Sequence, residues 1–310
     1  MTETGTVLIT GPTRNLGRFA ALALAELQEG QRPDLLLIGR AGADLTAVVN
    51  EARARGANVR EVGCDLSDLA DVRAAATAVR DLLASGAVRP LRALIANAGV
   101  MSSDTRKASA DGYELTFAVN YLAHAQLIGD LLESFTAPAR VVLIGSNTYY
   151  SNIFRKMLGV AAADWADPVK LARPAPSDQE PSTTTSGVAY SNSKLAVLYY
   201  AHELQRRAGS GINVSIFEPG WMPGTSLSRG TPAPVQAIGR ALSRIPGVST
   251  PERSGPLLAA MAVDEKWANV RDGAFVVKDK LTEVQPIAHD RDRERRLWEA
   301  TGELTSGVAG

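Results

Sequence analysis

The 310-residue chain balances 33 lysines and arginines against 33 aspartates and glutamates, and 45% of its residues are hydrophobic. This composition is typical of globular proteins and leaves room for one large domain, which we expect to span 1–310. The balanced charge gives no electrostatic reason to expect a nucleic acid or an anionic membrane as a partner.

Cysteine and histidine are scarce. Cys64, the single cysteine, excludes an internal disulfide framework, fits a reducing compartment and follows a strand-like run, so we expect a buried structural thiol. His124, His202 and His289 show no ligand spacing, and no metal site is predicted. The first residues lack a signal-peptide pattern and no apolar stretch is long enough to span a bilayer, so we expect a cytoplasmic protein.

Short apolar runs alternate with alanine- and leucine-rich helical segments along the chain. Helices are expected within 18–30, 44–56 and 71–86, the last two starting near an aspartate that could cap them. Near-continuous apolar runs suit strands covered on both faces, and this alternation predicts an α/β fold with a doubly wound parallel sheet of about seven strands. The expected strands lie at 6–10, 34–39, 58–63, 91–97, 139–145, 212–219 and 273–277.

Two segments interrupt this alternation. Residues 147–187 contain aromatic side chains and then a Pro/Ser/Thr-rich part that we expect to be irregular, and residues 221–248 are rich in turn-forming residues. Each segment follows the carboxyl end of a strand, where ligands bind in this architecture, so we interpret both as walls of a substrate site. For the first segment, a solvated insertion is the alternative.

The first strand ends in the sequence TGPTRNLG, which leads into a helix. Such a turn directs backbone N–H groups and the helix N-terminus at a pyrophosphate. Gly11 would form the tight turn, Gly17 would permit close helix packing, and Asn15 tolerates left-handed backbone dihedrals.

Two arginines bear on the choice of nucleotide. NAD-binding versions of this turn place an acidic residue about twenty positions further on. Here the second strand ends at Arg40, and Arg14 lies within the loop itself. Two guanidinium groups suit a 2′-phosphate, so we predict NADP(H), with a solvated charge at the strand end as the alternative interpretation of Arg40.

Tyr190 and Lys194 occur one helical turn apart in the sequence YSNSK. Taken alone, such a pair is better interpreted as a surface contact on a helix. Whether Tyr190 and Lys194 form a surface contact or part of an active site therefore depends on the rest of the chain.

Over essentially its whole length the chain resembles the short-chain dehydrogenase/reductase superfamily. The pattern is most similar to the branch of retinol-dehydrogenase-like and protochlorophyllide-reductase-like proteins, although Trp221 replaces the cysteine of the latter and makes chlorophyll chemistry doubtful. The resemblance rests on motifs in the family's order, namely TGPTRNLG, CDLSD, ANAGV, FAVNYLAHAQL, VVLIGS, YSNSK and EPGWMPGTS.

This resemblance implies a set of site residues. The catalytic tetrad would be Asn120, Ser146, Tyr190 and Lys194. Cofactor contacts would come from the phosphate loop, the following strand ends and the loop after the sixth strand, namely Gly11, Thr13, Arg14, Asn15, Leu16, Gly17, Arg40, Asp65, Leu66, Asn97, Ala98, Gly99, Tyr190, Lys194, Pro219, Gly220 and Thr225.

The implied reaction is reversible NADPH-linked reduction of a carbonyl. Tyr190 would supply the proton, Ser146 would orient the carbonyl, and Lys194 with the nicotinamide would lower the pKa of the phenol. Asn120 would support a water that links Lys194 to solvent. The alternatives are a non-redox enzyme of the same fold (a cyclase, dehydratase or epimerase) and an NADP-binding sensor.

Aromatic and apolar residues of the two segments suggest a bulky hydrophobic substrate, unless they serve only to anchor the segments. The insertion between Ser146 and Tyr190 is similar to that of monomeric carbonyl reductases, so we expect a monomer or a non-standard homodimer. The candidate wall residues are Tyr149, Tyr150, Ile153, Phe154, Met157, Leu158, Trp165, Trp221 and Met222.

Overall fold

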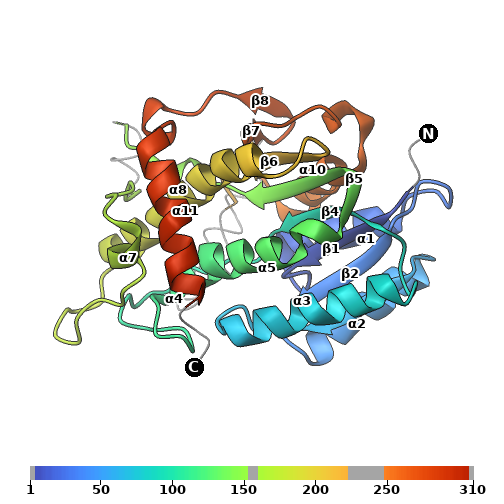
Figure 1. Cartoon of the computed structure of the whole chain (residues 1–310), viewed down its shortest axis with the longest axis horizontal. Helices are drawn as coiled ribbons and strands as arrows, with labels where there is room; N and C mark the ends of the chain where they lie inside the picture. The colour runs from blue at the N-terminus through green and yellow to red at the C-terminus, as the bar shows by residue number, and fades with distance from the viewer. Residues whose placement is uncertain (1–3, 153–159, 223–247, 307–310) are drawn as a thin grey trace.

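The computed structural model describes residues 4–152, 160–222 and 248–306. Its centre is a single eight-stranded sheet with the strand order β3-β2-β1-β4-β5-β6-β7-β8 (Figure 1). Neighbouring strands are parallel except for β7 and β8. The strands are β1 (Thr6–Thr10), β2 (Asp34–Gly39), β3 (Val59–Gly63), β4 (Leu91–Ala96), β5 (Phe135–Ile144), β6 (Ile212–Glu218), β7 (Ala274–Val277) and β8 (Lys280–Thr282).

All seven strands expected from the sequence are present, and the parallel doubly wound fold is confirmed. The central strands are apolar because both of their faces are covered: β1 is buried throughout, and Leu8 lies between Leu36 of β2 and Leu94 of β4. The eighth strand, β8, was not expected. Its three residues are exposed and carry no apolar run, since the strand only closes the edge of the sheet.

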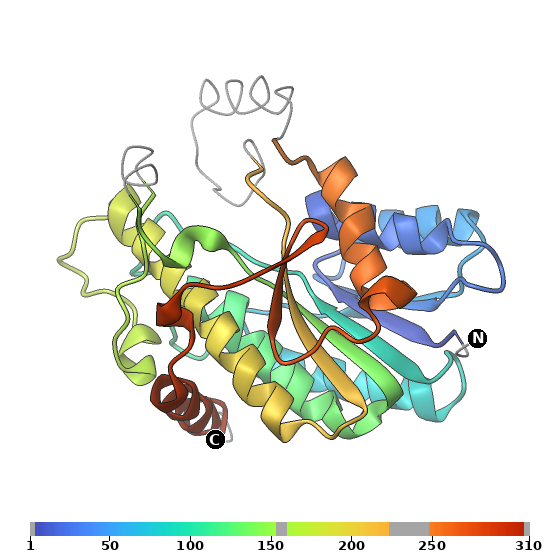
Figure 2. The ribbon, with the colours of Figure 1, turned by 90° about the horizontal axis from the view of Figure 1, so that it is seen from above.

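Two layers of helices cover the sheet. One face packs against α1, α2 and α10, and the other packs against α3, α5, α8 and α11. Figure 2 shows α10 with α1 and α2 on one side of the strands, and α5 with α8 on the other. The helices are α1 (Asn15–Ala25), α2 (Ala43–Ala54), α3 (Leu69–Ala84), α5 (Ala123–Leu131), α8 (Thr183–Arg207), α10 (Pro251–Val263) and α11 (Arg291–Ser306).

Aspartate caps only one of the two helices that were expected to start near a capping aspartate. Asp68 caps α3 by accepting hydrogen bonds from the N–H groups of Ala70 and Asp71. In α2 the cap position is Gly42, and Asp44 lies in the first turn without capping it. No helix in the described part of the chain has both the length and the apolar character needed to cross a membrane.

The order of the strands reverses between β1 and β4, which are neighbours in the sheet although two strands separate them in sequence. In doubly wound sheets the connections on either side of such a point lead to opposite faces, which opens a crevice at the carboxyl ends of the strands. The phosphate loop follows β1 and the sequence ANAG overlaps the end of β4, so both predicted cofactor segments border this crevice.

The first interrupting segment is more ordered than expected. It contains η3 (Asn147–Tyr149) and α7 (Pro168–Leu171), and α8 already begins at Thr183, capped by Ser182. Its Asp167 pairs with Arg296 of α11 at 2.9 Å. The segment is therefore attached to the domain in its described part, and residues 153–159 lie outside that part.

Candidate active site

The turn after β1 has the backbone geometry that its sequence predicts. Gly11 has a φ of +65°, and a Cβ there would lie 2.9 Å from the Cα of Ala98. Asn15 has a φ of +47°, the left-handed conformation for which asparagine is suited. A Cβ at Gly17 would lie closer than 3.0 Å to Asn97 Nδ2 and to the Gly11 carbonyl. Glycine is thus required at positions 11 and 17, because neighbouring atoms lie too close to the backbone there to leave room for a Cβ.

The ends of β1 and β4 are joined by hydrogen bonds. Thr10 Oγ1 accepts from the N–H groups of Asn97 and Ala98, both at 3.0 Å. Asn97 Nδ2 donates to the carbonyls of Thr10 at 2.9 Å and Gly11 at 3.1 Å. Asn97 therefore holds the phosphate loop against β4, and Thr10 is a positioning residue that the sequence analysis missed.

A buried histidine connects this loop to Asn120. His124 Nε2 lies 2.9 Å from Thr10 Oγ1, and His124 Nδ1 lies 3.2 Å from the Asn120 carbonyl. Because Thr10 Oγ1 already accepts two N–H groups, its own hydrogen is directed at Nε2, which leaves Nδ1 to donate to Asn120. Burial lowers the pKa of His124 to about 4, so the ring stays neutral at physiological pH.

Asn120 lies in a π-helical turn, η1 (Ala118–Leu122), which follows the three-residue helix α4 (Leu115–Phe117). Such turns are frequent at functional sites. Asn120 Oδ1 accepts from the Val100 N–H at 2.7 Å, and Nδ2 donates to the Val100 carbonyl at 2.9 Å and to Ser193 Oγ at 3.0 Å. Ser193 Oγ donates in turn to the Tyr190 carbonyl at 2.7 Å. Ser193 is a second positioning residue that the sequence analysis missed.

Tyr190 and Lys194 lie on the same helix, α8, as their spacing predicts. Lys194 is buried and its Nζ donates to the Ile144 carbonyl at 2.9 Å. The same Nζ lies 5.6 Å from the centre of the Tyr190 ring. Burial lowers the pKa of Lys194 to about 8.

The protein raises the pKa of Tyr190 to about 12, mainly by burial. A hydrogen bond with Ser146 lowers it, and the charge of Glu218 raises it further. Lys194 is not among the groups that shift this pKa in the protein alone, and its ammonium group is directed at the Ile144 carbonyl. That Lys194 and a bound nicotinamide together lower the pKa of the phenol stays a prediction.

Ser146 and Glu218 complete the polar surroundings of Tyr190. Ser146 follows β5 and caps η3 by accepting from the Thr148 N–H at 3.3 Å. Glu218 is buried at the end of β6, and its Oε2 accepts from the Gly220 N–H at 3.1 Å. The sequence EPG drew attention to this turn, but nothing in it indicated that the carboxylate acts on Tyr190.

The residues predicted to contact the nucleotide phosphate and adenine lie along the same edge of the sheet. Arg14 is exposed and pairs with Asp44 at 2.7 Å, while Arg40 is exposed at the end of β2. Asp65 Oδ1 accepts from Ser67, and Leu66 is buried.

The remaining predicted cofactor residues have mixed surroundings. Leu16 is buried and Thr13 half-buried in the phosphate loop. The Pro219 carbonyl accepts from Ser254 Oγ at 3.0 Å. Gly99 lies beside Asn120, and Gly220 has a φ of +85°. Thr225 lies outside the described residues.

The aromatic residues predicted as substrate walls divide into two groups. Tyr149 is fully buried and its hydroxyl accepts from the Gln285 N–H at 2.9 Å, and Trp165 packs edge-to-face on Tyr199 at 4.9 Å. These two side chains anchor the segment, as the alternative interpretation held. Trp221, by contrast, is 62% exposed. Tyr150 and Met222 pack partly against the core, and Ile153, Phe154, Met157 and Leu158 lie outside the described residues.

The geometry agrees with comparisons to known proteins. The family model for short chain dehydrogenase matches residues 5–155. A polyprenol dehydrogenase of Mus musculus is 32% identical over 98% of this chain and 84% of its own length. The chain belongs to the short-chain dehydrogenase family. This assignment makes the protein an oxidoreductase.

Within the short-chain dehydrogenases, retinol dehydrogenase 14 of Mus musculus is 30% identical over 98% of this chain and 86% of its own, which confirms the resemblance to the retinol-dehydrogenase-like branch. A short chain dehydrogenase from Burkholderia cenocepacia, crystallised in complex with NADP, superimposes with a TM-score of 0.63. It is 21% identical, covers 90% of this chain and 98% of its own, and supports the fold.

Proposed function

We propose that this protein is an NADP(H)-dependent oxidoreductase that interconverts a carbonyl and an alcohol, with Tyr190 as general acid and base. The observation that supports this proposal most strongly is that Tyr190, Ser146 and Lys194 lie together beside Asn120. These groups lie at the carboxyl edge of the sheet, where the turn at Gly11 also lies. Two residues of α8, one residue that follows β5 and one residue of η1 are thus combined in one polar cluster.

The residues around the phosphate loop fit a dinucleotide. The N-terminus of α1 has no side-chain cap and no acidic residue in its first turn, so its positive dipole end is available to a pyrophosphate. The exposed guanidinium of Arg40 suits a 2′-phosphate, and the next acidic residue in sequence, Asp44, is paired with Arg14. When bound, the nicotinamide supplies or accepts the hydride.

The side chains then handle the proton and the substrate oxygen. Tyr190 with a pKa of about 12 is protonated at neutral pH, which is the form needed to donate a proton to an oxygen that gains charge. Ser146 is hydrogen-bonded with Tyr190 and would hold the same oxygen. A cationic Lys194 would favour the phenolate that remains after the transfer.

We propose a bulky hydrophobic substrate, and specifically a long isoprenoid alcohol or aldehyde. Relatives of this chain carry the names polyprenol dehydrogenase and retinol dehydrogenase, and both names denote isoprenoid alcohols. The exposed indole of Trp221 directly follows the Pro219–Gly220 turn and offers an apolar surface at this edge.

The test is a reductase assay with NADPH or NADH and a series of aldehydes from short aliphatic to long isoprenoid, followed by the absorbance of the reduced nicotinamide. We expect turnover with NADPH in preference to NADH, and a rising kcat/KM with chain length. Tyr190→Phe should abolish turnover while NADPH binding, measured by fluorescence, persists. Tyr199→Phe removes a hydroxyl nine residues along the same helix and should leave kcat largely unchanged.

Two results would count against the proposal. Full activity of Tyr190→Phe would exclude Tyr190 as the proton donor. Conversion of a substrate without net consumption of NADPH would replace the redox assignment by a non-redox reaction of the same fold.

A further inference from the structure

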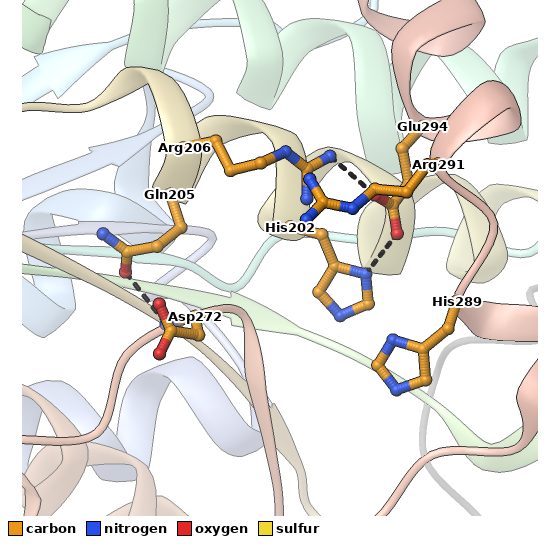
Figure 3. A pocket seen from close by; sticks show the side chains of 7 residues that line it. All are labelled: His202, Gln205, Arg206, Asp272, His289, Arg291 and Glu294. Carbon is orange, nitrogen blue, oxygen red and sulfur yellow. Dashed lines mark hydrogen bonds and ion pairs between the residues drawn. The ribbon is translucent and has the colours of Figure 1, made fainter.

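A second polar site lies away from the tetrad, near the opposite edge of the sheet. It borders a cavity of about 310 Å³ lined by α8, α11 and the segments that precede β7 and α11 (Figure 3). His202 is twelve residues beyond Tyr190 on α8, which corresponds to about 18 Å along the helix axis. The lining residues are His202, Gln205, Arg206, Asp272, His289, Arg291 and Glu294.

Three of these side chains form a compact set of metal-ligating groups. One ligand atom from each of His202, His289 and Glu294 lies within 4.8 Å of the other two. The two imidazole rings are stacked, with centroids 5.0 Å apart and an interplanar angle of 11°. His202 and Glu294 are buried whereas His289 is exposed, so a fixed pair of ligands faces a third that can move.

We propose that His202, His289 and Glu294 bind one Zn²⁺ ion. Two imidazoles and one carboxylate are a ligand set that zinc accepts, and a water molecule would complete a tetrahedron. Nothing in the sequence indicated this set because His202 lies far along the chain from His289 and Glu294, and only the packing of α11 against α8 brings them together.

Two side chains must adjust to hold the ion. Metal–ligand bonds of about 2.0–2.1 Å in a tetrahedron place ligand atoms roughly 3.3 Å apart, whereas the ligand atoms of this set lie within 4.8 Å of one another. His202 Nδ1 donates its hydrogen to Glu294 Oε1 at 2.8 Å, so metal binding either releases that proton to solvent or turns the ring to present Nε2. The exposed His289 side chain can approach by rotating about its side-chain bonds.

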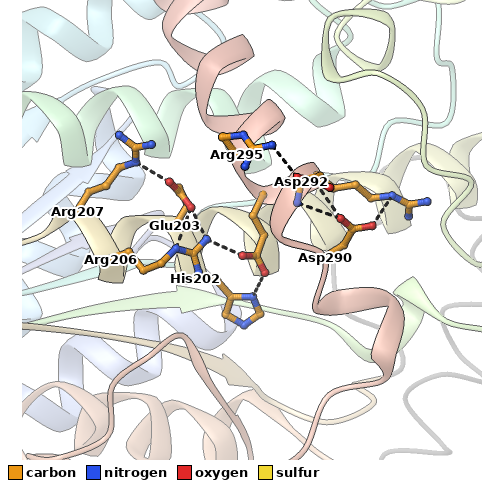
Figure 4. A network of polar contacts seen from close by, with 9 residues as sticks. His202, Glu203, Arg206, Arg207, Asp290, Asp292 and Arg295 are labelled. Atoms are coloured by element: carbon orange, nitrogen blue, oxygen red, sulfur yellow. Dashed lines mark hydrogen bonds and ion pairs between the residues drawn. The ribbon is translucent and has the colours of Figure 1, made fainter.

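An ion pair with a neighbouring arginine holds the Glu294 carboxylate in place. Glu294 Oε2 accepts from Arg206 at 2.6 Å, which leaves Oε1 directed at His202. Arg206 also pairs with Glu203, and Glu203 pairs with Arg207 at 2.7 Å (Figure 4). An arginine bonded to the second oxygen orients a ligating carboxylate in the way that outer-shell groups do in metal sites.

A metal at this position would connect three segments: the distal half of α8, the turn that carries His289 and the first turn of α11. Its role would be structural, since it lies far from Tyr190. A ligand that binds the folded chain only raises the apparent stability, so Zn²⁺ should increase the melting temperature.

The test is calorimetric titration of ZnCl₂ into the full-length, tag-free, metal-stripped protein at pH 7.5, with MgCl₂ as the hard-cation comparison. We expect one Zn²⁺ per chain, no saturation with Mg²⁺, and a d–d absorption typical of four-coordinate Co²⁺ when CoCl₂ is used. His289→Ala should weaken Zn²⁺ binding at least about tenfold and remove the zinc-dependent rise in melting temperature. This substitution changes an exposed side chain, so the variant should fold.

Asp272→Asn is the matched control. Asp272 lines the same cavity but does not belong to the ligating set, and asparagine tolerates its φ of +64°. Zn²⁺ affinity within about twofold of the parent is expected. Equal affinity in His289→Ala and the parent, or the absence of saturable Zn²⁺ binding in the parent, would overturn the proposal. None of these measurements uses redox turnover, so their outcome is independent of the function proposed above.

Discussion

The buried ammonium of Lys194 links the stability of the protein to pH. Its pKa is about 8 in the folded chain against an ordinary value of 10.5. Between these values the unfolded chain holds more protons than the folded chain, so stability rises with pH in this window. From pH 8 to pH 9 the contribution of Lys194 to the free energy of unfolding should rise by about 1 kcal/mol.

Urea unfolding of the parent and of Lys194→Met at both pH values measures this contribution. Between pH 8 and pH 9 the stability of the parent should rise by about 1 kcal/mol more than that of the variant. Cys64, whose pKa burial raises from 9.0 to about 12, opposes the rise as the pH approaches and passes 9, but does so equally in both proteins. The same pH response in the two proteins would contradict the assignment to Lys194.

Other atoms approach the Gly17 backbone closely, so a larger side chain at this position should destabilise the protein. In Gly17→Ala the new Cβ would meet Asn97 Nδ2 and the Gly11 carbonyl at less than 3.0 Å, and the carbonyl is backbone that cannot rotate away. We expect a loss of about 1–3 kcal/mol in the free energy of unfolding. Because the turn itself must shift, NADPH binding should weaken as well.

Gly129→Ala provides the comparison. Gly129 lies in α5, is exposed, and would have no atom within 4 Å of an added Cβ. This substitution should stabilise the protein by about 0.5–1 kcal/mol through higher helix propensity. If both variants lose stability alike, the cost at Gly17 does not arise from its contacts.

The sequence could predict residues whose role follows from local backbone geometry. Asn15 and Gly17 are in this class, because a turn between a strand and a helix dictates what each must do. Thr10, His124 and Ser193 are not, since their hydrogen-bond partners come from other elements and exist only once the sheet is assembled. The low pKa of His124 and the high pKa of Tyr190 depend on burial, which has no local sequence signature.

At the level of elements, apolar runs located the seven parallel strands because these strands are buried on both faces. The same criterion could not find β8, whose residues are exposed, or α7, which has only four residues. Residues 183–187 of α8 fell within the segment expected to be irregular, since the threonines at the N-terminus of α8 have low helix propensity and the cap at Ser182 compensates for them.

The contribution of the N-terminal cap of α8 to the stability of the protein can be measured. Ser182 Oγ accepts from the Thr185 N–H at 3.1 Å. Ser182→Ala should reduce the free energy of unfolding by about 1 kcal/mol, and Ser182→Asp should retain most of it because aspartate is also a good cap. Urea unfolding followed by far-UV circular dichroism gives both values. Since Tyr190 lies two turns further on, in the part of α8 that packs on the core, kcat should change little in either variant.

At the level of the whole molecule, α11 covers part of α8 and changes which surfaces are free for association. Trp298 of α11 stacks on Tyr200 of α8 with ring centroids 5.6 Å apart and an interplanar angle of 11°. The Arg207 guanidinium lies 4.8 Å from the centre of the same indole. Tyr121 of η1 is hydrogen-bonded to Thr301, so α11 also contacts the π-helical turn before α5.

A second copy that approached this face of α8 would first have to displace α11. The aromatic stack, the buried Leu297 and the links to α7 oppose such displacement. We therefore predict that the protein sediments as a monomer of 32.8 kDa at micromolar concentrations. Trp298→Ala should lower the free energy of unfolding by about 1–3 kcal/mol without changing the sedimenting mass. A parent protein of twice the chain mass, dissociated by Trp298→Ala, would instead show that α11 belongs to an interface between two chains.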